Sequence, residues 1–157
     1  MEIIHKDGDI FKGSETFKVH QVNCKGVMGA GIAKQVSTDY PEVYEYYKKA
    51  CEMTDESSKL LGMVQVIQTK KGFYIVNLFG QDDYYSPTGR CTNYEAFYNG
   101  LEKIKKYIIA KNLPREIAFP CRIGSALAGG DWNVIYAMIC SVFNNTDFKI
   151  VIYDFKK

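Results

Sequence analysis

The chain contains 157 residues, of which 46% are hydrophobic and 24% are charged, and its formal net charge is +2. This length and composition are typical of one globular domain with a sizeable core, so we assign residues 1–157 to a single domain and expect a monomer. The small net charge and the dispersed lysines argue against nucleic acid as the main partner. No apolar run is long enough to span a membrane and no stretch resembles a secretory leader, so we expect a cytoplasmic protein without a membrane partner.

The five cysteines are scattered and form no Cys-x-x-Cys pair, and the chain has only two histidines. Because this is not the spacing of a zinc site or a disulfide framework, we expect free thiols, no metal and no cofactor. Cys24 and Cys121 lie at glycine-rich turns, where each is either a nucleophile or a small packed side chain. Neither has a neighbouring base in the sequence, which favours packing.

Strands and helices alternate along the chain, with no linker, repeat or low-complexity segment. In chain order the pattern predicts strands at Met1–His5 and Phe17–Val22, helices at Gly31–Asp39 and Glu42–Cys51, strands at Gly62–Thr69 and Phe73–Phe79, a helix at Asn93–Lys111, a strand at Glu116–Phe119, a helix at Trp132–Asn144 and a strand at Lys149–Tyr153. The short polar segment before Phe73 predicts a hairpin, so the sheet should be mixed. This alternation predicts an α/β fold, a three-layer α/β/α sandwich.

A glycine-rich turn follows the strand predicted at Phe17–Val22. Its glycines, Gly26, Gly29 and Gly31, allow positive φ angles and let a ligand approach the backbone. A helix that begins here directs its first N–H groups and its dipole at an anion such as a phosphate. The spacing is neither that of a dinucleotide fingerprint nor that of a P-loop, so this turn alone is also compatible with an ordinary strand-to-helix connection.

A second small-residue turn, from Cys121 to Gly130, joins the strand at Glu116–Phe119 to the helix at Trp132–Asn144. Asp131 is a good N-cap for that helix. Two loops that follow parallel strands lie side by side at the carboxyl edge of a sheet, where open α/β folds bind ligands. Although each loop could be an ordinary turn, the pair favours a diphosphate cleft.

Three motifs in this order resemble those of macrodomains: Gly8-Asp9-Ile10, the segment Asn23–Gln35 and the segment Arg122–Trp132. The resemblance is to the compact branch that contains the fungal ADP-ribose 1''-phosphate phosphatase and the terminal ADP-ribose protein glycohydrolase. It extends from Met1 to the closing strand at Ile150–Tyr153. It implies a macrodomain sandwich that binds ADP-ribose.

The resemblance also implies contacts along ADP-ribose. Asp9 would accept a hydrogen bond from the adenine amino group, although by itself it is equally a turn residue. Phe155 would cover the adenine face or, alternatively, pin the C-terminus to the core. The glycine loops would hold the diphosphate, and Asn23 the distal ribose. The predicted binding residues are Gly8, Asp9, Ile10, Gln21, Val22, Asn23, Met28, Gly29, Ala30, Gly31, Ile32, Ala33, Ile123, Gly124, Ser125, Ala126, Leu127, Ala128, Gly129 and Phe155.

The positions that carry out catalysis in the glycohydrolase relative differ in this chain. That relative uses a lysine after the fourth strand and an aspartate in the second loop, which correspond to Gln81 and Ala128 here. Glutamine cannot form the amine adduct and alanine cannot act as a base. The phosphatase relative matches better through Val19–Cys24, Met28–Ala33 and Asp39–Glu42.

Four residues are candidates for chemistry at the distal ribose: Asn23, His20, Asp131 and Gln81. Asn23 would orient the substrate, and His20 or Asp131 would act as acid or base. Alternation along a strand puts residues 20 and 23 on opposite faces, which favours a core-edge imidazole over a catalytic role for His20. A plain N-cap is likewise favoured over a catalytic acid for Asp131. The polar segment Asp82–Arg90 is either a lid, with Arg90 meeting a phosphate, or a solvent loop.

We therefore expect an ADP-ribose-binding protein that hydrolyses a distal-ribose derivative, with ADP-ribose 1''-phosphate as the first candidate. One alternative is a non-catalytic reader or scavenger of ADP-ribose. Another is a hydrolase that removes ADP-ribose from protein or nucleic acid without using a lysine. The absence of the lysine–aspartate pair separates these hypotheses and favours the first two.

Overall fold

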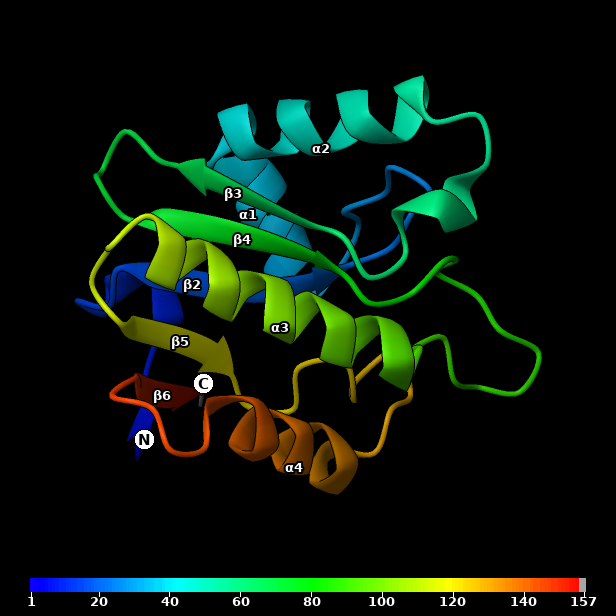
Figure 1. Cartoon of the computed structure of the whole chain (residues 1–157). Coiled ribbons are helices and arrows are strands. Elements are labelled where there is room, and N and C mark those ends of the chain that lie inside the picture. The colour runs from blue at the N-terminus through cyan, green and yellow to red at the C-terminus, as the bar shows by residue number, and fades with distance from the viewer. Residues whose placement is uncertain (156–157) are drawn as a thin grey trace.

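The computed structural model describes residues 1–155 and contains one six-stranded sheet with helices on both faces (Figure 1). The strands are β1 (Glu2–Asp7), β2 (Phe17–Val22), β3 (Val64–Gln68), β4 (Tyr74–Phe79), β5 (Glu116–Pro120) and β6 (Lys149–Asp154). The helices are α1 (Gly31–Asp39), α2 (Pro41–Met53), α3 (Tyr94–Ala110) and α4 (Trp132–Phe143), with short 3-10 helices η1 (Ile10–Lys12) and η2 (Ser57–Leu60). The predicted three-layer α/β/α sandwich is confirmed.

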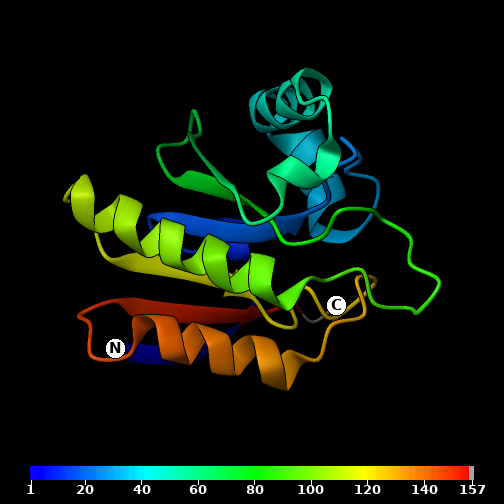
Figure 2. The same ribbon diagram turned by 45° about the vertical axis from the view of Figure 1, so that its right-hand side comes forward.

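The strand order across the sheet is β1-β6-β5-β2-β4-β3. Only β3 runs antiparallel to its neighbour, so the sheet is mixed, as the predicted hairpin required. The other neighbouring strands are parallel. The loops that follow β2, β4 and β5 therefore emerge at the same edge of the sheet, as the two ribbon views agree (Figures 1 and 2).

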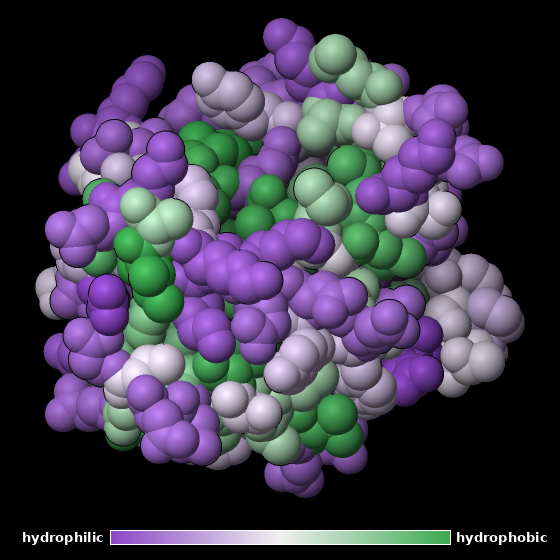
Figure 3. Space-filling view, in the orientation of Figure 1, coloured by the Kyte–Doolittle hydropathy of each residue, from purple (hydrophilic) through white to green (hydrophobic). Residues whose placement is uncertain are grey.

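Each face of the sheet is covered by one pair of helices. Helices α3 and α4 pack on the face that carries Phe17 and Val19 of β2, and α1 and α2 pack on the face that carries Val22. Strands buried on both faces have nearly continuous apolar sequences, as Ile75 to Phe79 of β4 show. The outer surface over α3 and α4 is largely hydrophilic, with hydrophobic side chains in small separate areas (Figure 3).

Most predicted boundaries agree with the structure to within two residues. Strand β3 begins at Val64 and not at Gly62, because Gly62 has a φ of 81° and belongs to the turn that precedes the strand. The segment after β1 forms η1, which the sequence pattern did not predict. Among residues 1–155, no helix is long and apolar enough to cross a membrane.

Candidate functional site

A continuous cleft runs along the carboxyl edge of the sheet in three connected sections. The first, here called the Asp9 end, has a volume of about 390 Å³ and shares Gly31 and Ile32 with a middle section of about 240 Å³. The middle section shares Ala30 and Gln81 with the third, the Asn23 end, of about 300 Å³. Since a single ligand pocket commonly spans about 300–1,000 Å³, the three sections together suit an elongated ligand.

At the Asp9 end, Asp9 has the turn role that the sequence also allowed. Its Oδ1 accepts a hydrogen bond from the backbone N–H of Phe11 (2.9 Å) and so caps η1, and its Oδ2 lies 3.4 Å from Nε2 of Gln35. Asp9 and Phe155 both line the cavity, and the contact of Asp9 with adenine stays a prediction. Phe155 is 62% exposed, so its ring lies at the rim of the cavity and is not pinned in the core.

The middle section is built from the N-terminus of α1 and the loop after β5. Helix α1 begins at Gly31, whose φ is +59°, and its N-cap residue Ala30 has no polar side chain to cap the helix. The first N–H groups of a helix have no intrahelical acceptor, and together with the dipole they favour an anion. Gly124, with φ +73°, lies opposite in the second loop. This arrangement fits the predicted diphosphate site.

A close approach between two loops explains one of the glycines. A Cβ on Gly129 would collide with the carbonyl oxygen of Gly89, at a φ of +71°. Just beside this contact, the backbone N–H of Cys91 donates to the carbonyl of Ala128 (2.7 Å). The segment after β4 is thereby tied to the second loop. The guanidinium of Arg90 lies over the ring of Tyr94 at 4.6 Å, and Arg90 is not among the described lining residues, so its contact with a phosphate stays a prediction.

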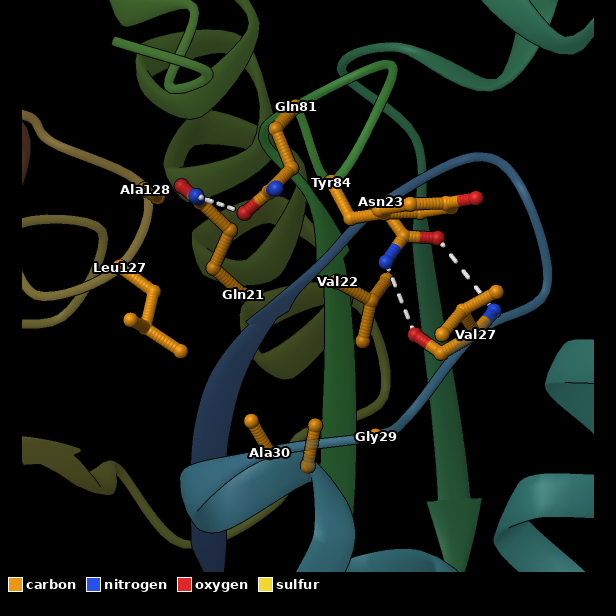
Figure 4. Close-up of a pocket in the computed structure, with 11 residues that line it drawn as sticks. Gln21, Val22, Asn23, Val27, Gly29, Ala30, Gln81, Tyr84, Leu127 and Ala128 are labelled. Carbon is orange, nitrogen blue, oxygen red and sulfur yellow. Dashed lines mark hydrogen bonds between the residues drawn. The ribbon is translucent and has the colours of Figure 1, made fainter. Parts of the chain in front are cut away.

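At the Asn23 end, the carboxamide of Asn23 has a defined orientation (Figure 4). Its Oδ1 accepts from the backbone N–H groups of Lys25 (3.0 Å) and Val27 (3.4 Å), and the Tyr47 hydroxyl lies at 2.7 Å. Its Nδ2 donates to the carbonyl of Val27 (2.8 Å). Because backbone N–H groups only donate and carbonyls only accept, the oxygen is occupied, and one N–H donor of the amide is left for a ligand.

A second oriented amide lies across the same cavity. Gln81 donates from Nε2 to the carbonyl of Asp83 (2.8 Å), and its Oε1 accepts from Nε2 of Gln21 (2.7 Å). Gln21 also donates to Thr92 (2.9 Å), whose hydroxyl donates to the carbonyl of Gly124 (2.6 Å). The network ends at two backbone carbonyls, which fixes the orientation of every member. Gln81 therefore also keeps one N–H donor.

The lining of the Asn23 end is electrically neutral. Among the described residues that line it, none is Asp, Glu, Lys, Arg or His. Gln81 and Ala128 both line this cavity (Figure 4). Tyr84 (63% exposed) and Leu127 (82% exposed) form an apolar rim. The cavity can orient a substrate through hydrogen bonds but has no strong acid or base of its own.

The other predicted catalytic candidates lie away from this lining. His20 borders the middle section, where its Nε2 lies 2.6 Å from Oδ1 of Asn77, and burial lowers its pKa to about 4. Asp131 caps α4 by accepting from the N–H of Asn133 (2.9 Å) and is not among the described lining residues. Burial, helped by the Asp82 carboxylate, raises the pKa of Cys24 to about 12, so this thiol is not an activated nucleophile.

Three predicted binding residues are not among the described lining residues of the cleft. Met28 is buried against the α1–α2 core, Ser125 turns its hydroxyl toward the carbonyl of Ile123 (3.5 Å), and Gly129 packs against Gly89. The structure also adds lining residues that the predicted binding set did not include: Val27, Gln35, Gln81, Tyr84, Pro120, Cys121, Arg122, Tyr153 and Asp154. Several of them follow a strand directly, which was the available signal. Among residues 1–155, no cluster of His, Cys, Asp or Glu is arranged to hold a metal ion.

Comparison with known proteins shows which proteins this chain resembles. The Macro domain family model matches residues 19–139. The chain is 28% identical over 152 residues to the DNA ADP-ribosyl glycohydrolase of Mycobacterium tuberculosis, covering 96% of this chain but only 42% of that relative. It is 31% identical over 153 residues to human ADP-ribose glycohydrolase OARD1, covering 96% of this chain and 90% of that protein.

Solved structures agree with the sequence comparison. The macrodomain of Mycobacterium tuberculosis DarG superposes with a TM-score of 0.81 at 29% identity, covering 96% of each chain. A Bacteroides thetaiotaomicron protein of unknown function superposes with a TM-score of 0.85 at 27% identity, covering 98% of each chain. These matches do not distinguish between branches of the family. The chain belongs to the macro domain family.

Proposed function

We propose that this macro domain binds ADP-ribose along the cleft and hydrolyses a substituent on its distal ribose, with ADP-ribose 1''-phosphate as the first candidate substrate. The order of chemical groups along the cleft supports the ligand: a carboxylate at Asp9, a helix N-terminus at Gly31 and oriented amides at Asn23 and Gln81. These groups match an adenine amino group, a diphosphate and a ribose with its substituent. The names of the relatives, which are ADP-ribosyl hydrolases, also support this class of ligand and reaction.

One observation favours a phosphate as the substituent. The oxygens of Asn23 and Gln81 already accept hydrogen bonds from the protein, so both amides offer only N–H donors to a ligand. A pair of donors suits the acceptor-rich, negatively charged oxygens of a phosphate. Because both donors are uncharged, they can orient the phosphate without holding the product tightly.

The proposed hydrolysis needs no acid or base from the protein. Water attacks the phosphorus and forms a new P–O bond while the bond between phosphorus and O1'' of the ribose breaks. The proton that water loses passes through a phosphate oxygen to the departing O1'', so the products are ADP-ribose and inorganic phosphate. The contribution of the protein is orientation and stabilisation of the charge on the phosphate by the two amides.

The direct test is release of inorganic phosphate from ADP-ribose 1''-phosphate by the purified protein, with ADP-ribose binding measured in parallel. We expect phosphate release well above the rate in buffer. A protein that binds ADP-ribose tightly and releases no phosphate would instead be a reader or scavenger, a function that the neutral lining of the Asn23 end also supports.

A gain-of-function variant tests the third hypothesis, removal of ADP-ribose from protein or nucleic acid. The double variant Gln81→Lys with Ala128→Asp restores an amine and a carboxylate in one cavity. We expect it to acquire hydrolysis of ADP-ribosylated glutamate, which the wild type should lack. Strong activity of the wild type on ADP-ribosylated protein or DNA would show that this cleft uses a route without the lysine.

A further inference from the structure

A buried ion pair lies beneath the loop that carries Asp9. The side chains of Lys18 and Glu15 are each only 1% exposed, and Nζ of Lys18 lies 4.0 Å from Oε1 of Glu15. Lys18 also donates to the carbonyls of Ile10 (2.7 Å) and Gly13 (2.8 Å). Lys18 comes from β2, so a charged side chain of the sheet holds two carbonyls of the connection between β1 and β2.

Glu15 links this contact to Tyr153 of β6. Its Oε1 accepts a hydrogen bond from the hydroxyl of Tyr153 at 2.8 Å, across a sequence separation of 138 residues. A Cβ on Gly13 would collide with both the Tyr153 hydroxyl and Glu15, so the loop closes tightly over the pair. Oε2 of Glu15 has no hydrogen-bond partner among the described residues. Burial of a charge pair that is not fully satisfied is costly, and packed apolar side chains of similar size would often be at least as stable.

Both ends of this network reach residues that line the Asp9 end. The carbonyl of Ile10 binds Lys18 and the hydroxyl of Tyr153 binds Glu15, and the two residues pack in one buried cluster beneath the cavity that both of them line. Asp9 lies immediately before Ile10 and borders the same cavity. Burial lowers the pKa of Lys18, and the nearby carboxylates of Glu15 and Asp9 oppose that change.

We propose that Lys18 and Glu15 are positioning residues that set the base specificity of the Asp9 end, because they fix the loop that carries Asp9 and Ile10 against Tyr153 and so fix where the Asp9 carboxylate meets the base. This inference rests on the proposed binding of ADP-ribose. Neither residue lines the cavity, so each acts through Ile10, Asp9 and Tyr153. This role gives a reason for the presence of a buried ion pair that is costly for stability.

The test compares dissociation constants for ADP-ribose and for its hypoxanthine analogue, inosine diphosphate ribose, by calorimetry. The wild type should prefer ADP-ribose by about tenfold or more, because only adenine offers an amino group to Asp9. In Lys18→Met the affinity for ADP-ribose should fall by roughly tenfold, and the preference should shrink to within about threefold. A role confined to stability would lower the folded fraction and leave this ratio unchanged.

Two further variants keep the test decisive. The double variant Lys18→Met with Glu15→Gln removes both charges, and the new amide oxygen would still accept from Tyr153, so it should fold even if the single variant does not. Its selectivity should be lost as well. The matched control is Lys103→Met, which removes a lysine–carbonyl bond of the same kind, to Gly62 at 2.7 Å, away from the described lining of the cleft. Its selectivity should equal that of the wild type.

The outcomes separate the inference from the proposed function. Folded Lys18 variants with the base preference of the wild type would overturn the positioning role and leave ADP-ribose binding intact. A wild type that binds neither nucleotide would overturn the proposed function and this inference with it. Loss of the preference in both Lys18 variants, with normal behaviour of the control, would support the inference.

Discussion

The two ends of the cleft differ in the charge of the side chains that form them. The Asp9 end has a carboxylate on its surface and a buried ion pair, Lys18 with Glu15, beneath it. The Asn23 end has two uncharged amides, oriented by Gln21 and by backbone groups, and a lining without acidic or basic side chains among the described residues. The first end is suited to discriminate between bases, and the second is suited to orient a charged substituent.

The difference follows from what each end has to recognise. An exocyclic amino group is a weak donor, and a charged acceptor strengthens the hydrogen bond that it makes. A phosphate already carries its own charge, so neutral donors with fixed directions are sufficient, and they avoid the cost of a buried unpaired charge before the ligand arrives.

The largest expected effect is at the section that joins the two ends. Gly31→Glu places a carboxylate at the N-terminus of α1, where the diphosphate is proposed to bind, and ADP-ribose affinity should fall by roughly a thousandfold or more. The control is Gly72→Glu in the β3–β4 hairpin, another positive-φ glycine whose added Cβ would meet nothing within 4 Å. Normal calorimetric binding by Gly31→Glu would contradict the assignment of the middle section.

The second prediction separates catalysis from binding at the Asn23 end. Asn23→Ala should lower the rate of phosphate release by about 100- to 1,000-fold, the range for loss of an oriented donor, and raise the dissociation constant for ADP-ribose much less. Asn93→Ala is the control, because it removes an amide oxygen that accepts a backbone N–H (2.9 Å) at the start of α3. Equal losses in rate and affinity would show that Asn23 only binds the ligand.

The third prediction concerns the neutral imidazole between the ends. Burial lowers the pKa of His20 to about 4, whereas a histidine in the unfolded chain has a pKa of about 6.5. Between these values the unfolded chain binds a proton that the folded protein does not, so stability is lost as the pH falls through this window.

The size of this effect can be measured against a variant. Between about pH 7 and pH 4.5 the wild type should lose on the order of 2–3 kcal/mol more free energy of unfolding than His20→Gln, which keeps a donor for Asn77. Denaturant titrations at both pH values measure the difference. The same pH dependence in the two proteins would show that His20 is not held neutral.

The smallest expected effect is at the charged end. Asp9→Ala should weaken ADP-ribose binding by about 1–3 kcal/mol and reduce the preference for adenine. Asp131→Ala is the matched control, since both carboxylates accept a backbone N–H at 2.9 Å as helix N-caps. The same variant tests whether Asp131 has a role in chemistry. Unchanged binding and selectivity in Asp9→Ala would limit Asp9 to the turn.

Much of the fold could be predicted from the sequence, because its signals are local. Apolar periodicity and the residues at helix starts, such as Pro41 and Asn93, locate the elements to within a few residues. The glycines at positions 31 and 124 mark the two loops, because their φ angles are positive. The alternation of strands and helices then brings both loops to the same edge of a parallel sheet.

Side-chain direction at the site could be predicted only in part. The sequence pattern identifies the two loops that contain Met28, Ser125 and Gly129. It does not show which residues of each loop face the cleft, since irregular backbone has no period. The contact of Arg90 with the ring of Tyr94 could not be predicted either, because the path of the irregular segment between β4 and α3 decides it.

Only the tertiary structure decided how the two ends are supported. Gln21 and Gln81 are 60 residues apart, and Glu15 and Tyr153 are 138 residues apart, yet each pair shares a hydrogen bond. The sheet order places their strands within reach of each other, and nothing in the local sequence of either partner specifies the other. The local pattern therefore determined where the cleft lies, whereas long-range pairing determined which atoms face it and which buried charges lie beneath the Asp9 end.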